Sequence, residues 1–163
     1  MGIMICGSSC YDRAGDANMT LLTQNALYCF DEGFFECSLV SAQSLLANTP
    51  AELKITLAHV GLQPASIDRL QKFQDLHDGR VTLLCMDTRL PDVTGSHLTN
   101  TALLRLVALT KFEGRVLYLD GDTLVRSGIN ELLNLPLDDK IVAAAVCPTH
   151  YSWWYKSRSQ FRP

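Results

Sequence analysis

Short apolar segments that alternate with helix-like segments constrain the fold of this chain more than any other feature of its sequence. Segments with the length and composition of buried strands occupy residues 26–30, 54–60, 81–86, 115–119 and 141–146. Between the first two, residues 35–47 place Phe35, Leu39, Ala42 and Leu46 on one apolar helix face. This alternation predicts an α/β fold with a doubly wound, mostly parallel sheet and flanking helices.

Three further helices are expected in the remaining connections. A helix opens at Pro64, because proline is well tolerated in the first helical turn, and another begins near Thr99 or Asn100, which can cap it. A short helix is expected at 127–134. The apolar residues that we expect on the buried faces are Ile67, Leu70 and Phe73 in the first of these helices, and Leu103, Leu106 and Val107 in the second.

The strand-like segment 115–119 stops at two acids separated by a glycine, Asp120, Gly121 and Asp122. If the extended backbone continues, side chains two residues apart leave the same face, so both carboxylates point to one place. Gly121 has no Cβ, which allows the backbone to turn and a ligand to approach closely. Open α/β sheets bind ligands at the carboxyl ends of their strands, and paired carboxylates suit magnesium, calcium or manganese. The alternative is an ordinary turn, because aspartate and glycine are common turn residues.

Composition and charge exclude several classes of protein. The 163 residues are enough for one domain, and 47% apolar with 19% charged residues indicates a globular chain rather than a disordered one. A net charge of −3 supplies no basic surface, so we expect no nucleic-acid partner. No apolar run approaches the ~20 residues that span a bilayer, so we expect no transmembrane segment.

We divide the chain into three parts. Residues 1–25 are polar, rich in small residues and without the pattern of a secretory signal, so we expect a leader with little fixed structure. Residues 26–150 form the α/β domain. Residues 151–163 are basic and aromatic, which allows weak contact with a membrane surface, although we favour a segment without its packing partner.

The six cysteines show no C-x-x-C pair. Cys6 and Cys10 have three residues between them and no matching second pair, which makes a poor zinc clip. We therefore expect free thiols in a reducing, cytoplasmic location.

Three segments, in the right order, resemble family 8 glycosyltransferases, the group that includes glycogenin and bacterial lipopolysaccharide sugar transferases. Residues 115–126, RVLYLDGDTLVR, resemble the D-x-D segment of that family. Residues 26–46 resemble its first strand, strand-end acid and first helix, and residues 96–106 resemble an upstream segment that carries an arginine. The resemblance covers about residues 26–147 and implies a GT-A-type, Rossmann-like fold that is truncated at the C-terminus.

The resemblance implies a retaining transferase that moves a hexose from a UDP-sugar donor to a saccharide or protein acceptor. It also implies manganese, with magnesium as an alternative, held by Asp120 and Asp122. Asp120 would in addition contact the ribose, and Gly121 would lie in the donor site between the two acids. A divalent cation there stabilises the charge on the leaving UDP.

The remaining site residues are implied by the same resemblance. Asp31 matches the residue that hydrogen-bonds uracil, and Cys29 and Phe30 match backbone and packing positions around that base. Arg105 matches an arginine near the donor's sugar and phosphates, where a cation offsets diphosphate charge. Taken without the resemblance, Asp31 is a strand-end turn residue and Arg105 an ordinary surface residue.

The sequence also departs from the family. Gly33 stands where many members have asparagine, and Leu103 replaces an aromatic residue. After Val146 we find no N-x-G strand, acceptor site or metal-binding histidine, which leaves the catalytic residue and the third metal ligand unknown. His59 and His97 receive no role.

Two alternatives stay open. One is a non-catalytic module that binds UDP or a partner subunit. The other, a nucleotidyltransferase, is disfavoured because no glycine-rich phosphate loop with a lysine follows the first strand. An open sheet edge would also favour a homo-oligomer.

Overall fold

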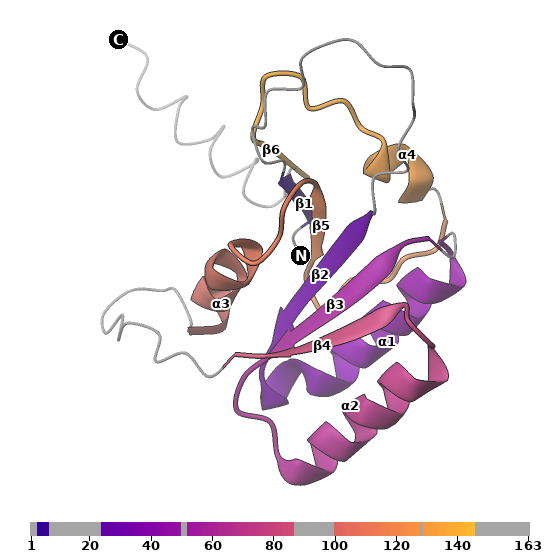
Figure 1. Ribbon diagram of the computed structural model, residues 1–163, viewed down its shortest axis with the longest axis vertical. Helices are drawn as coiled ribbons and strands as arrows, with labels where there is room; N and C mark the ends of the chain where they lie inside the picture. Colours follow the sequence, from indigo (N-terminus) through magenta and orange to yellow (C-terminus); the bar gives the residue numbers. More distant parts are fainter. Residues whose placement is uncertain (1–2, 7–23, 50–51, 87–99, 128, 146–163) are drawn as a thin grey trace, which may run out of the picture.

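The computed structural model describes residues 3–6, 24–49, 52–86, 100–127 and 129–145, which form a six-stranded sheet in the order β4-β3-β2-β5-β1-β6 (Figure 1). The strands are β1 (Ile3–Cys6), β2 (Asn25–Phe30), β3 (Lys54–His59), β4 (Val81–Cys85), β5 (Val116–Leu119) and β6 (Val142–Ala144). β2 runs parallel to β3 and β5, and β3 runs parallel to β4, whereas β1 is antiparallel to both β5 and β6. The expected α/β fold with a mostly parallel sheet is confirmed.

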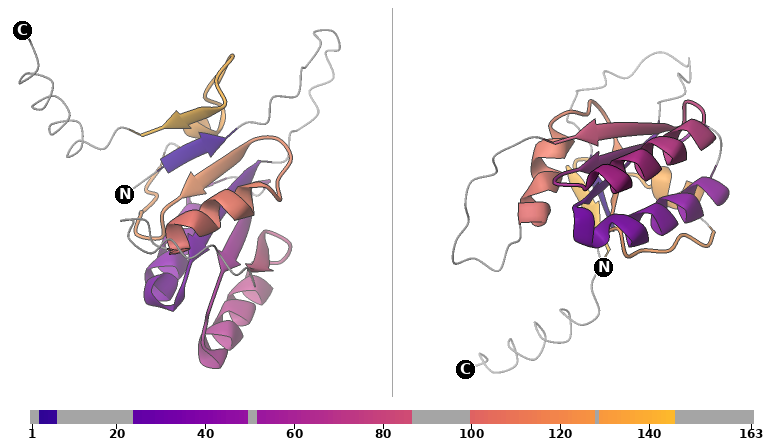
Figure 2. Two further views of the ribbon diagram at one scale, coloured as in Figure 1. Left: turned by 90° about the vertical axis from the view of Figure 1, so that its left-hand side faces the viewer. Right: turned by 90° about the horizontal axis from the view of Figure 1, so that it is seen from below.

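Helices cover both faces of this sheet (Figure 2). A 3-10 turn, η1 (Glu32–Phe34), leads into α1 (Phe35–Ala47), and α2 (Pro64–Leu76), α3 (Asn100–Leu109) and α4 (Ile129–Leu133) follow. Alternation along β2 directs Tyr28 and Phe30 into the core that α1, α2 and α4 cover, and Leu27 and Cys29 into the core under α3. The bounds expected for the first helix are confirmed, and so is Pro64 as the start of the second.

The first strand differs from our expectation of a leader without fixed structure. Ile3–Cys6 pairs with β5 along its whole length, from Ile3 opposite Leu119 to Cys6 opposite Val116. Without this partner, one side of β5 would expose a row of unpaired backbone groups, and the apolar run IMIC is long enough to cover it. The correction concerns these four residues, since 7–23 lie outside the described part of the chain.

The last strand and two helix faces also differ from the sequence-based expectation. β6 is not a buried strand: it lies at the sheet edge, where Val142 keeps 43% of its surface exposed. Leu106 and Ile67, which we placed on buried faces, are 57% and 40% exposed. From residue 103 to the end of α3, the buried residues are instead Leu104 and Ala108, which are one helical turn apart and pack on the sheet. Several apolar residues in one helix allow more than one stripe, and packing on the sheet selects between them.

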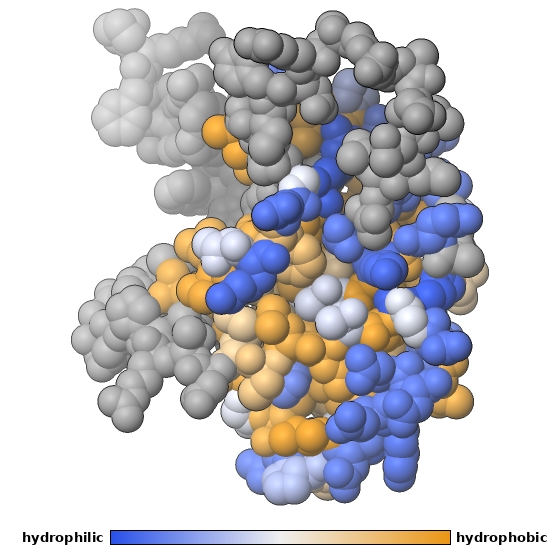
Figure 3. Space-filling view, in the orientation of Figure 1, coloured by the Kyte–Doolittle hydropathy of each residue, from blue (hydrophilic) through white to orange (hydrophobic). Residues whose placement is uncertain are grey.

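The face that Figure 3 presents shows apolar residues gathered over the middle of the molecule, where Figure 1 places the strands, and hydrophilic residues around them. In the described ranges, no helix has the length and apolar character needed to cross a membrane. The basic, aromatic segment 151–163 lies outside these ranges.

Candidate functional site

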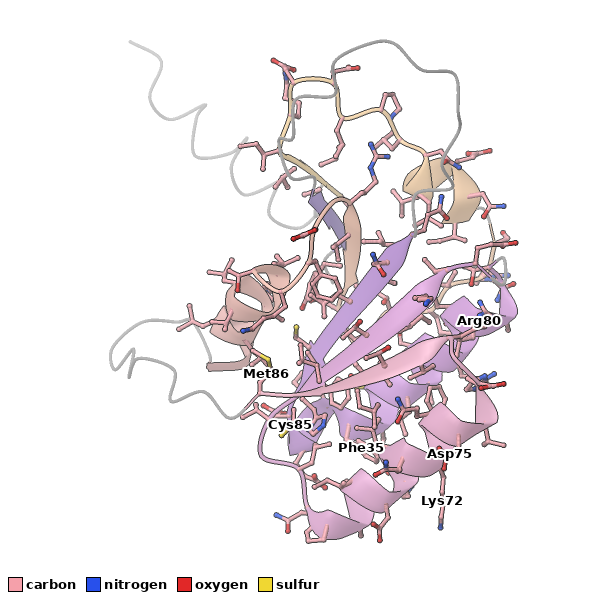
Figure 4. All side chains as sticks on the ribbon, viewed as in Figure 1. Phe35, Lys72, Asp75, Arg80, Cys85 and Met86 are labelled. Atoms are coloured by element: carbon pink, nitrogen blue, oxygen red, sulfur yellow. The ribbon has the colours of Figure 1, made fainter. Side chains whose placement is uncertain are left out.

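The parallel strands end together at one edge of the sheet. Phe30, at the end of β2, is in register with His59 at the end of β3, and His59 is in register with Cys85 at the end of β4. In Figure 4, Cys85 and Met86 lie at this edge beside α3, while Arg80 lies at the opposite end of β4. β5 points in the same direction and ends at Leu119, so Asp120 emerges at this edge as well. This is the edge at which open α/β sheets bind ligands.

Three side chains from two elements meet beside β5. The Tyr118 hydroxyl donates a hydrogen bond of 2.9 Å to Asp120 Oδ1, and Arg105 Nη1, from α3, lies 3.9 Å from the same oxygen. The Arg105 guanidinium also lies over the Tyr118 ring, 5.0 Å from its centroid, which is within the range of a cation–π interaction. Burial, and next the Asp120 carboxylate, raise the pKa of Tyr118, so its phenol keeps the proton that it donates. The fold therefore brings Arg105 and Asp120 together, although fifteen positions of sequence separate them.

Cys29 lies within the electrostatic field of this pair. Burial raises the pKa of its thiol to about 12, with Arg105 lowering it and Asp120 raising it further. Its side chain is only 6% exposed and belongs to the core under α3. Cys29 is thus a neutral thiol beside the site, and in the described ranges Cys29, Cys37 and Cys85 are free.

Asp31 and Phe30 leave β2 at the same edge with different surroundings. Asp31 Oδ1 accepts hydrogen bonds from the backbone N–H groups of Gly33 and Phe34, at 3.0 and 3.3 Å, and so caps η1. Phe30 is fully buried, with its ring 6.4 Å from those of Phe35 and His59. The ring of Phe30 therefore packs inside the core, and only its backbone lies at the edge.

The two acids are joined by a turn rather than by extended backbone. β5 ends at Leu119, and the N–H of Thr123 donates to the carbonyl of Asp120 at 3.1 Å. The strand alternation that we used to aim both carboxylates at one point therefore does not reach Asp122, and any shared direction depends on the shape of this turn. Asp120 is partly buried, with 26% of its side chain exposed, and Asp122 is exposed. We call residues 120–123 the acidic turn.

The side-chain oxygens of the acidic turn are of the chemical type that binds a hard divalent cation. Two carboxylates supply oxygen ligands, and magnesium or manganese commonly completes its shell with water and phosphate oxygens. Among the described residues, no group of three or more histidine, cysteine, aspartate or glutamate side chains is placed to hold a metal ion. The described residues thus place no third side chain of these types with Asp120 and Asp122.

A row of polar side chains on α1 contacts the acidic turn and the residues that follow it. We did not predict this row from the sequence. Ser41 Oγ lies 3.2 Å from Thr123 Oγ1, and Ser44 Oγ accepts a hydrogen bond of 3.0 Å from the N–H of Val125. Ser38 lies under Gly121, where a Cβ added to the glycine would meet Ser38 Oγ at 2.1 Å. We call Ser38, Ser41 and Ser44 the serine stripe. Their spacing of three residues along one helix was the signal in the sequence.

The comparison with known families decides the identity of the fold. Residues 25–161 match the sequence profile of Glycosyl transferase family 8. The chain belongs to that family. No curated protein sequence matches the chain significantly.

Solved structures of family 8 resemble the chain in fold. The galactosyltransferase LgtC, in complex with donor and acceptor sugar analogues, superposes with a TM-score of 0.52 at 18% identity, over 71% of this chain and 44% of that one. The Q189E active-site mutant of LgtC superposes with a TM-score of 0.55 at 22% identity, over 71% of this chain and 43% of that one. The glycosyltransferase GlyE of Streptococcus pneumoniae superposes with a TM-score of 0.51 at 20% identity, over 71% of this chain and 27% of that one. The chain thus spans less than half the length of these proteins, and the similarity establishes the fold.

Proposed function

We propose that this family 8 chain binds the donor of a metal-dependent, retaining glycosyltransferase, which moves a hexose from a UDP-sugar to a saccharide or protein acceptor. The observation that carries the proposal is the meeting of Arg105 with Asp120 at the carboxyl edge of the sheet. A guanidinium beside an acidic turn suits a ligand that carries both phosphates and a divalent cation.

Each site residue has a distinct part in this proposal. Asp120 and Asp122 hold manganese or magnesium, and Asp120 also contacts the ribose. Arg105 neutralises diphosphate charge, and its stacking on Tyr118 holds the guanidinium plane in one orientation. Asp31 pairs with the uracil ring, next to the backbone of Cys29 and Phe30. The bound cation supplies charge stabilisation for the departing UDP.

Calorimetric titration of UDP with and without manganese tests the proposal. We expect binding that manganese strengthens, and loss of that strengthening in Asp122→Ala, because the variant removes one exposed carboxylate without disturbing the core. Equal affinity of the wild-type chain with and without manganese would remove the metal from the proposal. An unchanged metal effect in Asp122→Ala would remove Asp122.

Release of UDP from UDP-glucose or UDP-galactose distinguishes the transferase from the second interpretation, a non-catalytic UDP-binding or subunit-interaction module. Metal-dependent binding of UDP without release from any donor would favour that module. Release that requires manganese and an acceptor saccharide would favour the transferase.

A further inference from the structure

The segment from Gly121, between the two acids, to Val125 runs along the serine stripe, and every second residue of this segment contacts one of the serines. Gly121 lies against Ser38, Thr123 contacts Ser41, and the N–H of Val125 donates to Ser44. At the far end, Asn48 Nδ2 donates to the carbonyl of Val125 at 3.0 Å. The backbone around the acids is therefore held by side chains of α1, as well as by its own turn.

The central contact belongs to a chain of buried hydroxyl groups. Tyr28 OH lies 3.1 Å from Ser41 Oγ, Ser41 Oγ lies 3.2 Å from Thr123 Oγ1, and the Thr123 hydroxyl donates to the Asp120 carbonyl at 2.6 Å. Tyr28, Ser41 and Thr123 are 0%, 1% and 3% exposed. When a buried hydroxyl loses its hydrogen-bond partner, no water can take the place of that partner. Removing one of these hydroxyls should therefore cost the full desolvation free energy of the group left behind.

Two of these hydrogen bonds have a fixed direction. The carbonyl of Asp120 can only accept, so the Thr123 hydroxyl donates to it, and the Ser41 hydroxyl donates to Tyr28 OH. Because each hydroxyl has a single hydrogen, the 3.2 Å contact between Ser41 and Thr123 shares one of these two hydrogens, and either residue could be the donor. Ser41 therefore links the buried phenol on β2 to the residue that bonds the backbone of the first acid.

We propose that Ser41, acting through Thr123, is a positioning residue that sets the acidic turn in the geometry that binds a divalent cation together with a nucleoside diphosphate. The inference rests on the proposed function. Thr123 bonds the Asp120 carbonyl through both its N–H and its hydroxyl, so it closes the turn that separates the two carboxylates. Loss of the hydroxyl frees the turn to change the distance between Asp120 and Asp122.

A pair of matched substitutions tests this. Thr123→Val removes the hydroxyl at nearly constant volume. Thr49→Val makes the same change at the end of α1, where the Thr49 hydroxyl donates to the Leu45 carbonyl at 2.7 Å, far from the acids. UDP affinity of the full chain is measured by calorimetry with manganese and without it, and melting temperature is recorded for both variants.

We expect Thr123→Val to weaken manganese-dependent UDP binding about three- to tenfold, the effect of losing one hydrogen bond, with little change in metal-free binding. Thr49→Val should lower the melting temperature while keeping the manganese effect. Thr123→Ser should bind UDP with the wild-type manganese effect, because serine retains the hydroxyl. Ser41→Ala should weaken manganese-dependent binding as Thr123→Val does.

The outcomes separate the inference from the function on which it rests. An unchanged manganese effect in Thr123→Val, or an equal loss in Thr49→Val, overturns the positioning role while the metal site stands. Absence of any manganese effect in the wild-type chain overturns both. If Thr123→Val does not fold, Ser41→Ala and Thr123→Ser decide between the same outcomes.

Discussion

Ser38 occupies the space in which any residue other than glycine at position 121 would place its Cβ. The added carbon would lie 2.1 Å from Ser38 Oγ, which is far inside normal contact. Gly121 does not adopt a positive φ, so the close approach of α1, rather than backbone conformation, requires glycine here. Ser38 Oγ is itself buried and has no hydrogen-bond partner, so in the described part of the chain the hydroxyl only fills space.

Gly121→Ala should therefore destabilise the protein by about 1–3 kcal/mol, the usual cost of overpacking. Ser38→Ala should be neutral or stabilising by up to about 1 kcal/mol, because it removes an unpartnered buried hydroxyl. In the double variant the nearest remaining atom is Ser38 Cβ at 3.2 Å, so most of the loss should be recovered. Urea unfolding of the four proteins measures the coupling. Additive effects of the two substitutions would show that the contact does not restrict residue 121.

Arg105→Gln should lower UDP affinity about tenfold or more, because it removes a charge-assisted contact with phosphate. Its effect on stability should stay below about 1 kcal/mol, since Arg105 and Asp120 are partly exposed, at 34% and 26%. Arg69→Gln is a matched control: Arg69 pairs with Glu36 and lies over the Phe35 ring at 5.1 Å, on the face of the sheet that α3 does not cover. Calorimetry in the presence of manganese provides the affinities. Equal losses in both variants would argue against a role for Arg105 in binding.

The stability of the protein should fall as the pH is lowered from about 7 to 5, in part because of His59. Burial lowers the pKa of His59 from its ordinary value of 6.5, so the unfolded chain binds a proton that the folded chain does not. The free energy of unfolding therefore increases as the pH rises across this window, and the contribution of His59 is lost as the pH falls. His59→Gln should flatten this part of the curve, whereas His77→Gln, at the half-buried residue that caps the C-terminal end of α2, serves as control. A curve for His59→Gln parallel to that of the wild type would contradict the burial of the neutral ring.

Cys29 should resist alkylation by iodoacetamide at pH 8 until the protein unfolds. With a pKa of about 12, only about one thiol in ten thousand is ionised at that pH, and the side chain is almost inaccessible. Cys85 is exposed and should react first. Mass spectrometry of peptides after timed labelling, with and without urea, measures both rates. Labelling of Cys29 in the folded protein at the rate of Cys85 would show that the core under α3 opens.

Local patterns predicted elements well where one periodicity dominated. The apolar spacing of α1 indicated 35–47, and Pro64 marked the start of α2, and both are confirmed. The same reasoning was wrong for Leu106, because α3 contains enough apolar residues to offer several stripes and only the sheet selects Leu104 and Ala108. It also missed the serine stripe, since the partners of these serines lie far away in the chain: Thr123 is 82 residues from Ser41, and Val125 is 81 residues from Ser44.

From residue 25 onward, the sequence by itself determined the succession of strands and helices along the chain and the emergence of Asp31 and Asp120 at the ends of two strands, because these depend on residue types a few positions apart. Only the tertiary structure decided that Ile3–Cys6 pairs with β5, that Arg105 stacks on Tyr118 beside Asp120, and that Ser41 reaches Thr123. These contacts join segments that are distant in the chain. Each partner is brought into place by the packing of the tertiary structure, so a local sequence pattern does not identify it.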